Sequence, residues 1–147
     1  MIHFIMLLAA LCATVSYTLI LRLERKHILP ASIGGLLTYG LYYLLYYLTN
    51  DLFLSNFAGA LLAAIYAYIL AVLCRTPATV FHSASVIPLV PGGMLYYTMD
   101  AMIQGDFAAT LKHGGDTLRV GLGIAAGIVL GGIAVRLFRS VRRVGRK

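Results

Sequence analysis

The sequence predicts an all-α integral membrane protein with about five transmembrane helices, and three observations predict it. Of the 147 residues, 61% are hydrophobic and only 12% are charged, whereas soluble domains carry about 25% charged residues. The charges are confined to short stretches, and long apolar runs separate them. Several runs reach the roughly 18 residues typical of a membrane-spanning helix. A soluble fold of this composition would expose large apolar patches and aggregate.

The apolar runs place all the predicted spans in one membrane domain that covers residues 1–147. The spans lie near 2–21, 31–48, 52–73, 79–97 and 120–137. The first run has its cations after it, beginning at Arg22, and a cleaved signal peptide carries them before its apolar core. We therefore expect the first span to stay in the membrane. A chain of this size is expected to be too small to act as a whole carrier.

Lys and Arg are distributed unevenly between the connections. If the N-terminus lies outside, the inside segments hold ten of the twelve cations. These are Arg22, Arg25, Lys26, Arg75, Arg136, Arg139, Arg142, Arg143, Arg146 and Lys147. Cytoplasmic flanks of membrane spans are rich in Lys and Arg, so the count predicts an N-out, C-in orientation. The same distribution bears on the net charge of +7. It favours an orientation signal that lies near anionic headgroups over a nucleic-acid-binding surface.

Small residues recur every four positions in two of the spans. The two stripes are Gly59, Ala63 and Ala67 in the third span and Gly123, Gly127 and Gly131 in the fifth. Helices in lipid associate through close backbone approach at such residues. The stripes therefore predict tight helix pairs, and they leave open whether both helices belong to this chain or one belongs to a second subunit.

The second span is rich in tyrosine, and Tyr39 and Tyr43 lie deeper in it than the outermost tyrosines. An interfacial belt or ordinary packing is the favoured interpretation of these side chains. The alternative is that one of them faces a polar cavity.

The fourth span carries an unusual run of helix breakers. Pro88 and Pro91 each remove a backbone donor, which costs about 3 kcal/mol in an ordinary helix interior, and Gly92 and Gly93 follow directly. We expect the helix to open near mid-membrane, where unpaired backbone groups must be buried in protein or line a wet cavity. Discontinuous helices supply substrate sites in many carriers, with half-helix N-termini pointed at anionic groups. A plain proline kink is the alternative.

Polar side chains precede the predicted break. His82, Ser83 and Ser85 lie just before it, and Arg75 lies at its cytoplasmic mouth. We interpret these four as residues of a substrate cavity, with His82 as a candidate proton carrier. Serines bonded to their own backbone are the alternative.

The run Pro88-Leu-Val-Pro91-Gly92-Gly93, followed by Tyr96, resembles the proline–glycine signature of the threonine/serine exporter family. In length and number of spans the chain is similar to the family's small, YjjB-type subunit, equivalent to the C-terminal half of the fused exporters. The resemblance implies export of small carboxylate-bearing metabolites across the bacterial inner membrane, either threonine and serine or dicarboxylates such as succinate. The resemblance also adds Tyr96 to the candidate site. It implies a larger YjjP-type membrane subunit as partner and allows assembly into a higher oligomer.

Two other function classes were weighed against a carrier. An intramembrane enzyme needs paired carboxylates, a nucleophile with a base, or a metal cluster. The predicted spans contain no Asp or Glu, so we expect no enzyme, no metal and no cofactor. A channel, or an assembly subunit that transports nothing, remains the alternative.

Overall fold

The computed structural model describes residues 2–21 and 23–144, with side-chain surroundings for 6–21 and 23–138, and this part of the chain is helical apart from short connections. The prediction of an all-α fold is confirmed. The elements are α1 (Ile2–Ile20), α2 (Arg25–Thr49), α3 (Leu52–Cys74), α4 (Ala78–Val86), the 3₁₀ turn η1 (Ile87–Leu89), α5 (Gly92–Ile103) and α6 (Phe107–Val144).

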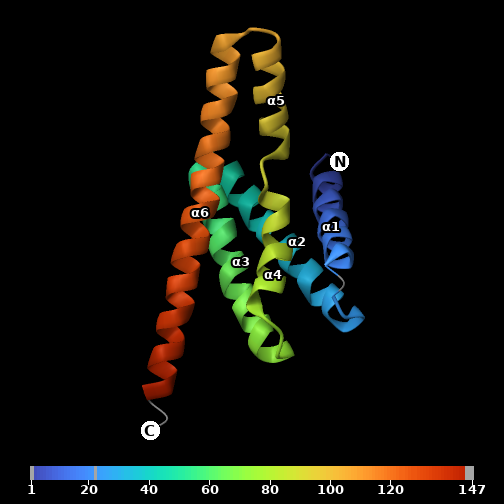
Figure 1. Cartoon of the computed structure of the whole chain (residues 1–147), viewed down its shortest axis with the longest axis vertical. Helices are drawn as coiled ribbons and strands as arrows, with labels where there is room; N and C mark the ends of the chain where they lie inside the picture. The colour runs from blue at the N-terminus through green and yellow to red at the C-terminus, as the bar shows by residue number, and fades with distance from the viewer. Residues whose placement is uncertain (1, 22, 145–147) are drawn as a thin grey trace.

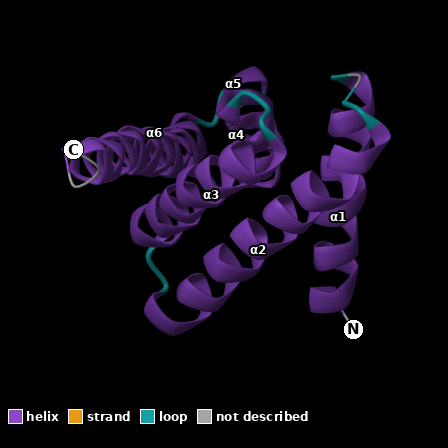
Figure 2. Ribbon diagram, turned by 90° about the horizontal axis from the view of Figure 1, so that it is seen from below, coloured by secondary structure: helices purple, strands orange, loops and turns teal. Residues whose placement is uncertain are grey.

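The helix α3 lies at the centre of the bundle. It packs against α6 on one side and against α2 and α4 on the other, and α1 packs along the far side of α2. Figure 2 shows this order, with α6 and α1 at opposite edges. The helix α5 packs along the first part of α6, and the two form a hairpin that projects beyond the other helices (Figure 1).

Three helices, α2, α3 and α6, are long and apolar enough to cross a membrane among the residues described. The pair α4–η1 and α5 makes a fourth candidate as one broken span, and α1 contributes a shorter apolar stretch, Met6–Ile20. The fifth span and the N-out, C-in orientation therefore stay predictions.

Carboxylates begin two of the helices. Asp51 caps α3 by accepting bonds from the backbone N–H groups of Phe53, at 2.8 Å, and Leu54, at 3.2 Å. Asp106 does the same for α6 through the N–H of Ala109, at 3.0 Å. Such caps satisfy backbone donors that have no partner within the helix. They explain why α3 starts at the predicted position and why α6 starts well before residue 120, the start expected for the fifth span.

The helices approach one another closely because small residues line their contacts. The core where α2, α3 and α4 meet consists of Ala31, Ala67, Leu70, Phe81 and Ala84. Across it, the Tyr66 hydroxyl of α3 donates a bond of 2.8 Å to the carbonyl of Pro30 in α2. Close approach of this kind replaces the hydrophobic driving force that lipid does not provide between helices.

The glycine stripe of α6 packs against α3. A Cβ added at Gly127 would lie 2.7 Å from the Cβ of Ala60, and one added at Gly131 would lie 2.5 Å from that of Ala64. A Cβ at Gly123 would likewise meet the Phe53 carbonyl oxygen, at 2.7 Å. The structure thus places this stripe against a helix of the same chain.

The second stripe, on α3, faces elsewhere. A Cβ at Gly59 would meet Leu89 of η1, at 3.2 Å, and the carbonyl of Thr38 in α2, at 3.4 Å. Ala67 belongs to the core that α3 shares with α2 and α4. The two stripes therefore do not pair with each other, and α3 uses one small face for α6 and another for α2 and the broken helix.

Candidate functional site

The fourth predicted span is broken where the prolines and glycines lie. The segment Ala78–Leu89 and α5 are bent by 49° relative to each other. Pro88 has no N–H to donate to the carbonyl of Ala84, and η1 closes instead by a 3.2 Å bond from the Val90 N–H to the carbonyl of Ile87. The predicted Pro/Gly break is confirmed.

The break lies deep in the predicted membrane region. The twelve residues Ala78–Leu89 form the first half of the broken span, which at 1.5 Å of rise per residue places the break about 18 Å from its start. The hydrocarbon core of a bilayer is about 30 Å thick. Backbone groups at this depth have no water from the bulk phase and depend on protein or on a hydrated cavity.

A cavity of about 440 Å³ adjoins the break. Its lining residues come from five helices and the break itself: Met6, Tyr39, Tyr42, Asn56, Pro88, Leu89, Val90, Pro91, Gly92, Gly93, Met94 and Val120. The Asn56 side chain is 2% exposed and donates a 2.7 Å bond from its amide nitrogen to the carbonyl of Leu52. The cavity thus combines apolar walls with an amide and two tyrosines, as ligand sites usually do.

The first turn of α5 opens into this cavity. Pro91, the residue before the helix, provides no side-chain cap, and the Gly92 N–H bonds to the carbonyl of Val90 at 2.8 Å. Gly93 and Met94 follow in the first turn and line the cavity. The N–H groups of a first turn have no partner within the helix, and they carry the positive end of its dipole.

The predicted polar residues do not gather at this cavity. The Ser83 hydroxyl donates a 2.8 Å bond to the carbonyl of Thr79, one turn earlier in α4. Ser85 is fully buried against Gly34 of α2. Tyr96 is 65% exposed on α5 and forms an edge contact with the Tyr97 ring, with centroids 5.5 Å apart.

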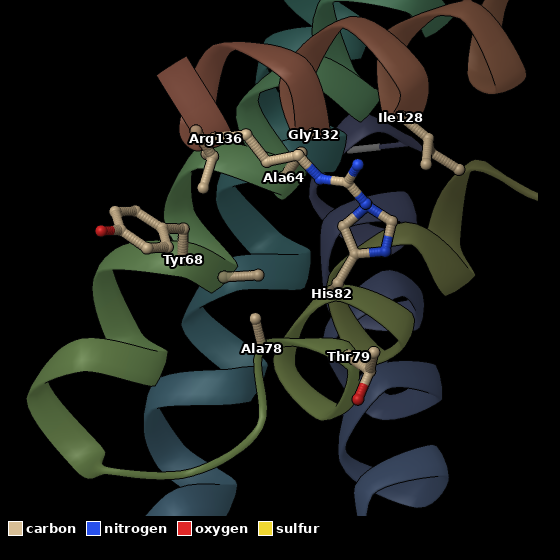
Figure 3. Close-up of a pocket in the computed structure, with 10 residues that line it drawn as sticks. Ala64, Tyr68, Ala78, Thr79, His82, Ile128, Gly132 and Arg136 are labelled. Atoms are coloured by element: carbon tan, nitrogen blue, oxygen red, sulfur yellow. The ribbon is translucent and has the colours of Figure 1, made fainter. Parts of the chain in front are cut away.

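Arg75 and His82 lie elsewhere again. Arg75 is exposed in the connection between α3 and α4, with φ of 53° at the end of α3. His82 lines a separate cavity of about 340 Å³ between α3, α4 and α6. Figure 3 shows its imidazole and the Arg136 side chain directed into that space. The roles of these side chains in solute binding, and of His82 as a proton carrier, stay predictions.

The family model described as threonine/serine exporter, ThrE, matches residues 6–134. The chain belongs to the threonine/serine exporter family. No curated protein and no solved structure matches it. The matched region contains the break and all the residues that line its cavity, so the cavity belongs to a membrane transporter of the exporter type.

Three residues of this exporter escaped the sequence-based prediction. Asn56 is the only amide side chain in the third predicted span. A search for polar residues within the predicted spans would therefore have found it. Tyr42 could not be distinguished from its neighbouring tyrosines, because the sequence does not show which face of α2 meets the break and so which tyrosines line the cavity. Arg136 counted only as an orientation signal, since nothing in the sequence places it opposite His82.

Proposed function

We propose that this chain is one subunit of a secondary exporter that moves small carboxylate-bearing metabolites across the bacterial inner membrane. The proposed solutes are threonine and serine, or dicarboxylates such as succinate. The observation that carries the proposal is the cavity at the mid-membrane break of a chain that belongs to the threonine/serine exporter family. The cavity volume of about 440 Å³ lies within the range of sites for small molecules.

In this proposal the backbone binds the carboxylate. The N–H groups of Gly93 and Met94 are hydrogen-bond donors at the positive end of the α5 dipole, an arrangement suited to an anion. The Asn56 amide and the hydroxyls of Tyr39 and Tyr42 are available to the other polar groups of the solute. The cavity lining contains no carboxylate that would repel the solute.

A second membrane subunit fits the open side of the break. Val90 is 52% exposed, and Gly92 and Gly93 are exposed beside it. Irregular backbone at this depth cannot face lipid, and the surface of another subunit would shield it in the working transporter. We propose that a larger, YjjP-type subunit provides this cover.

The decisive variant is Gly92→Leu. Gly92 lines the cavity, and a Cβ there has open space around it, so a leucine adds bulk at the edge of the cavity without displacing the backbone. Gly121→Leu is the matched control, because Gly121 has equally open space and lies outside the cavity lining. In cells loaded with radiolabelled threonine or succinate, we expect Gly92→Leu to lower the efflux rate at least tenfold at normal protein levels, and Gly121→Leu to leave it unchanged.

Unchanged efflux in Gly92→Leu would refute the site. A separate measurement decides between a carrier and the alternatives. The intact complex in liposomes with an imposed ion gradient is expected to accumulate solute against its own gradient, whereas a channel only dissipates that gradient. A subunit that transports nothing leaves efflux unchanged when it is deleted.

A further inference from the structure

The second cavity of this chain, near the start of the broken span, has a polar lining of its own. It measures about 340 Å³ and lies between α3, α4 and α6. Its lining consists of Ala64, Ala67, Tyr68, Ala78, Thr79, His82, Ile128, Gly132, Val135 and Arg136. None of these residues lines the cavity at the break, so the two cavities are distinct.

The helices α4 and α6 supply polar groups from opposite walls, and α3 adds Tyr68. On α6, Ile128, Gly132 and Arg136 follow one another at intervals of four residues and therefore share a face. On α4, Thr79 and His82 are three residues apart and share the face that meets it. Figure 3 shows Arg136 and His82 directed into the space between the helices. Gly132 keeps this space open, because a Cβ there would meet no atom within 4 Å.

The half-buried His82 and the exposed Arg136 each have polar atoms without a partner in the described part of the chain. The His82 Nε2 atom is buried and has no hydrogen-bond partner in the described structure. Within the same part of the chain, Arg136 forms no ion pair, and the cavity lining contains no carboxylate. A buried polar atom without a partner costs free energy, and a guanidinium group binds oxyanions through several donors at once. An oxyanion in this space could accept from the Arg136 guanidinium and also from the His82 Nε2 atom when that nitrogen carries the proton.

We infer that His82 and Arg136 form a second oxyanion site, which binds the carboxylate of the exported solute before the solute reaches the break. This inference rests on the proposed function and on the predicted orientation, in which this end of α4 faces the cytoplasm. His82 lies about 6 Å along α4 from Ala78, and Pro88 lies about 9 Å beyond it. The site thus stands between the cytoplasmic mouth and the break, where an exporter first meets its solute.

A lipid phosphate is the other source of the same chemistry. Arg136 stands near the end of the fifth predicted span, where arginine side chains commonly reach toward headgroups. His82 favours the solute, because its buried Nε2 shares the cavity with Arg136 instead of facing the bilayer surface. The experiment therefore includes an arm that separates the two sources.

Binding is measured first, by equilibrium dialysis of the purified complex with radiolabelled threonine or succinate. Wild type is expected to bind solute at two sites, and we expect Arg136→Gln and His82→Gln each to weaken one of them about ten- to hundredfold, the effect of losing a hydrogen bond to a charged group. Gly132→Leu, which fills the cavity and keeps both polar side chains, is expected to do the same. Lys26→Gln is the control, because it removes a cation that is paired with Glu24 at the surface and lines neither cavity. Threoninol, which has no carboxylate, is expected to bind wild type and Arg136→Gln equally.

Efflux then separates the inference from the function on which it rests. In loaded cells, the His82 and Arg136 variants are expected to raise KM while the maximal rate stays within about twofold of wild type, because the break is intact. Binding that is absent in wild type, or unchanged in all three cavity variants, overturns the second site. Binding that follows the expected pattern in a complex without efflux supports the site and overturns the exporter function.

The lipid arm uses proteoliposomes of phosphatidylcholine alone or with phosphatidylglycerol. A solute site predicts the same loss of affinity for Arg136→Gln in both membranes. A loss that occurs only with phosphatidylglycerol would identify a lipid headgroup as the occupant and would overturn the inference.

Discussion

The Ser85 side chain of α4 lies directly against the backbone of Gly34 in α2. A Cβ at position 34 would collide with the Ser85 Oγ atom and would lie 2.6 Å from the ring of Tyr66. Ser85 is fully buried, and its hydroxyl has no hydrogen-bond partner in the described structure. The residue that the sequence placed in a polar cavity therefore occupies a tight contact between two helices.

Replacing Ser85 with alanine is expected to leave the protein as stable or slightly more stable. The change removes a buried hydroxyl that forms no bond, and such a hydroxyl costs about 1–3 kcal/mol. Ser32→Ala is the matched control, because the buried Ser32 hydroxyl donates a 2.8 Å bond to the carbonyl of Ile28, and its loss is expected to cost about 1 kcal/mol. Thermal unfolding in detergent gives the comparison. Efflux is expected to stay normal in Ser85→Ala; a fall would place Ser85 back in the solute path.

The contact between α3 and α6 is expected to be sensitive to a single methyl group at Gly127. An added Cβ would lie 2.7 Å from that of Ala60, so the helices must separate, at a cost of about 1–3 kcal/mol. Gly121→Ala makes the same chemical change on the same helix where no atom lies within 4 Å. A lower unfolding temperature in Gly127→Ala alone is the expected result. Equal temperatures for both variants would contradict the close packing of the stripe.

The open side of the break is expected to be covered when the larger subunit is present. In a chain with Cys12 and Cys74 replaced by alanine, Val90→Cys introduces one thiol at a half-exposed position of the break. Maleimide labelling is expected to fall at least fivefold when both subunits are produced together. Gln104→Cys, at the exposed end of α5, is the control and should label equally in both cases. Equal labelling of Val90→Cys would argue against a partner at this surface.

The break could be predicted from the sequence because its cause is local. Pro88 and Pro91 lack the donors that a continuous helix needs, whatever surrounds them. The start of α6 at Phe107 was not predicted, although its cause is also partly local. Polar residues between 112 and 119 suggested a loop, but the Asp106 cap and packing against α5 hold this segment in a helix.

The directions of the side chains could not be predicted, because they depend on which helices are neighbours. His82, Ser83 and Ser85 follow each other closely, and helix geometry sends them to different sides. Only the packing of α4 against α2 and α3 decides that Ser85 meets Gly34 and that His82 faces the cavity it shares with Arg136 of α6. The glycine stripe of α6 was likewise visible, but the spacing left its partner open, and the structure places the stripe against Ala60 and Ala64 of α3.

Changing Asn56 to aspartate is expected to weaken export and to cost some stability, because a carboxylate cannot donate the bond that the Asn56 amide gives to the carbonyl of Leu52. The two side chains have nearly the same shape, and Asn56 is buried at the wall of the break cavity. A carboxylate there repels the carboxylate of the solute, and two like charges about 4 Å apart interact by roughly 4 kcal/mol in partly buried surroundings. Even a third of this repulsion raises KM about tenfold.

Asn50→Asp is the matched control, because Asn50 is exposed at the end of α2 with φ of 51°, a conformation that aspartate also tolerates. KM is measured from initial efflux rates at graded internal concentrations of threonine and succinate. The dicarboxylate is expected to suffer the larger increase, since its second charge adds to the repulsion. A KM for Asn56→Asp equal to that of Asn50→Asp, at equal protein levels, would show that the solute carboxylate does not pass this wall.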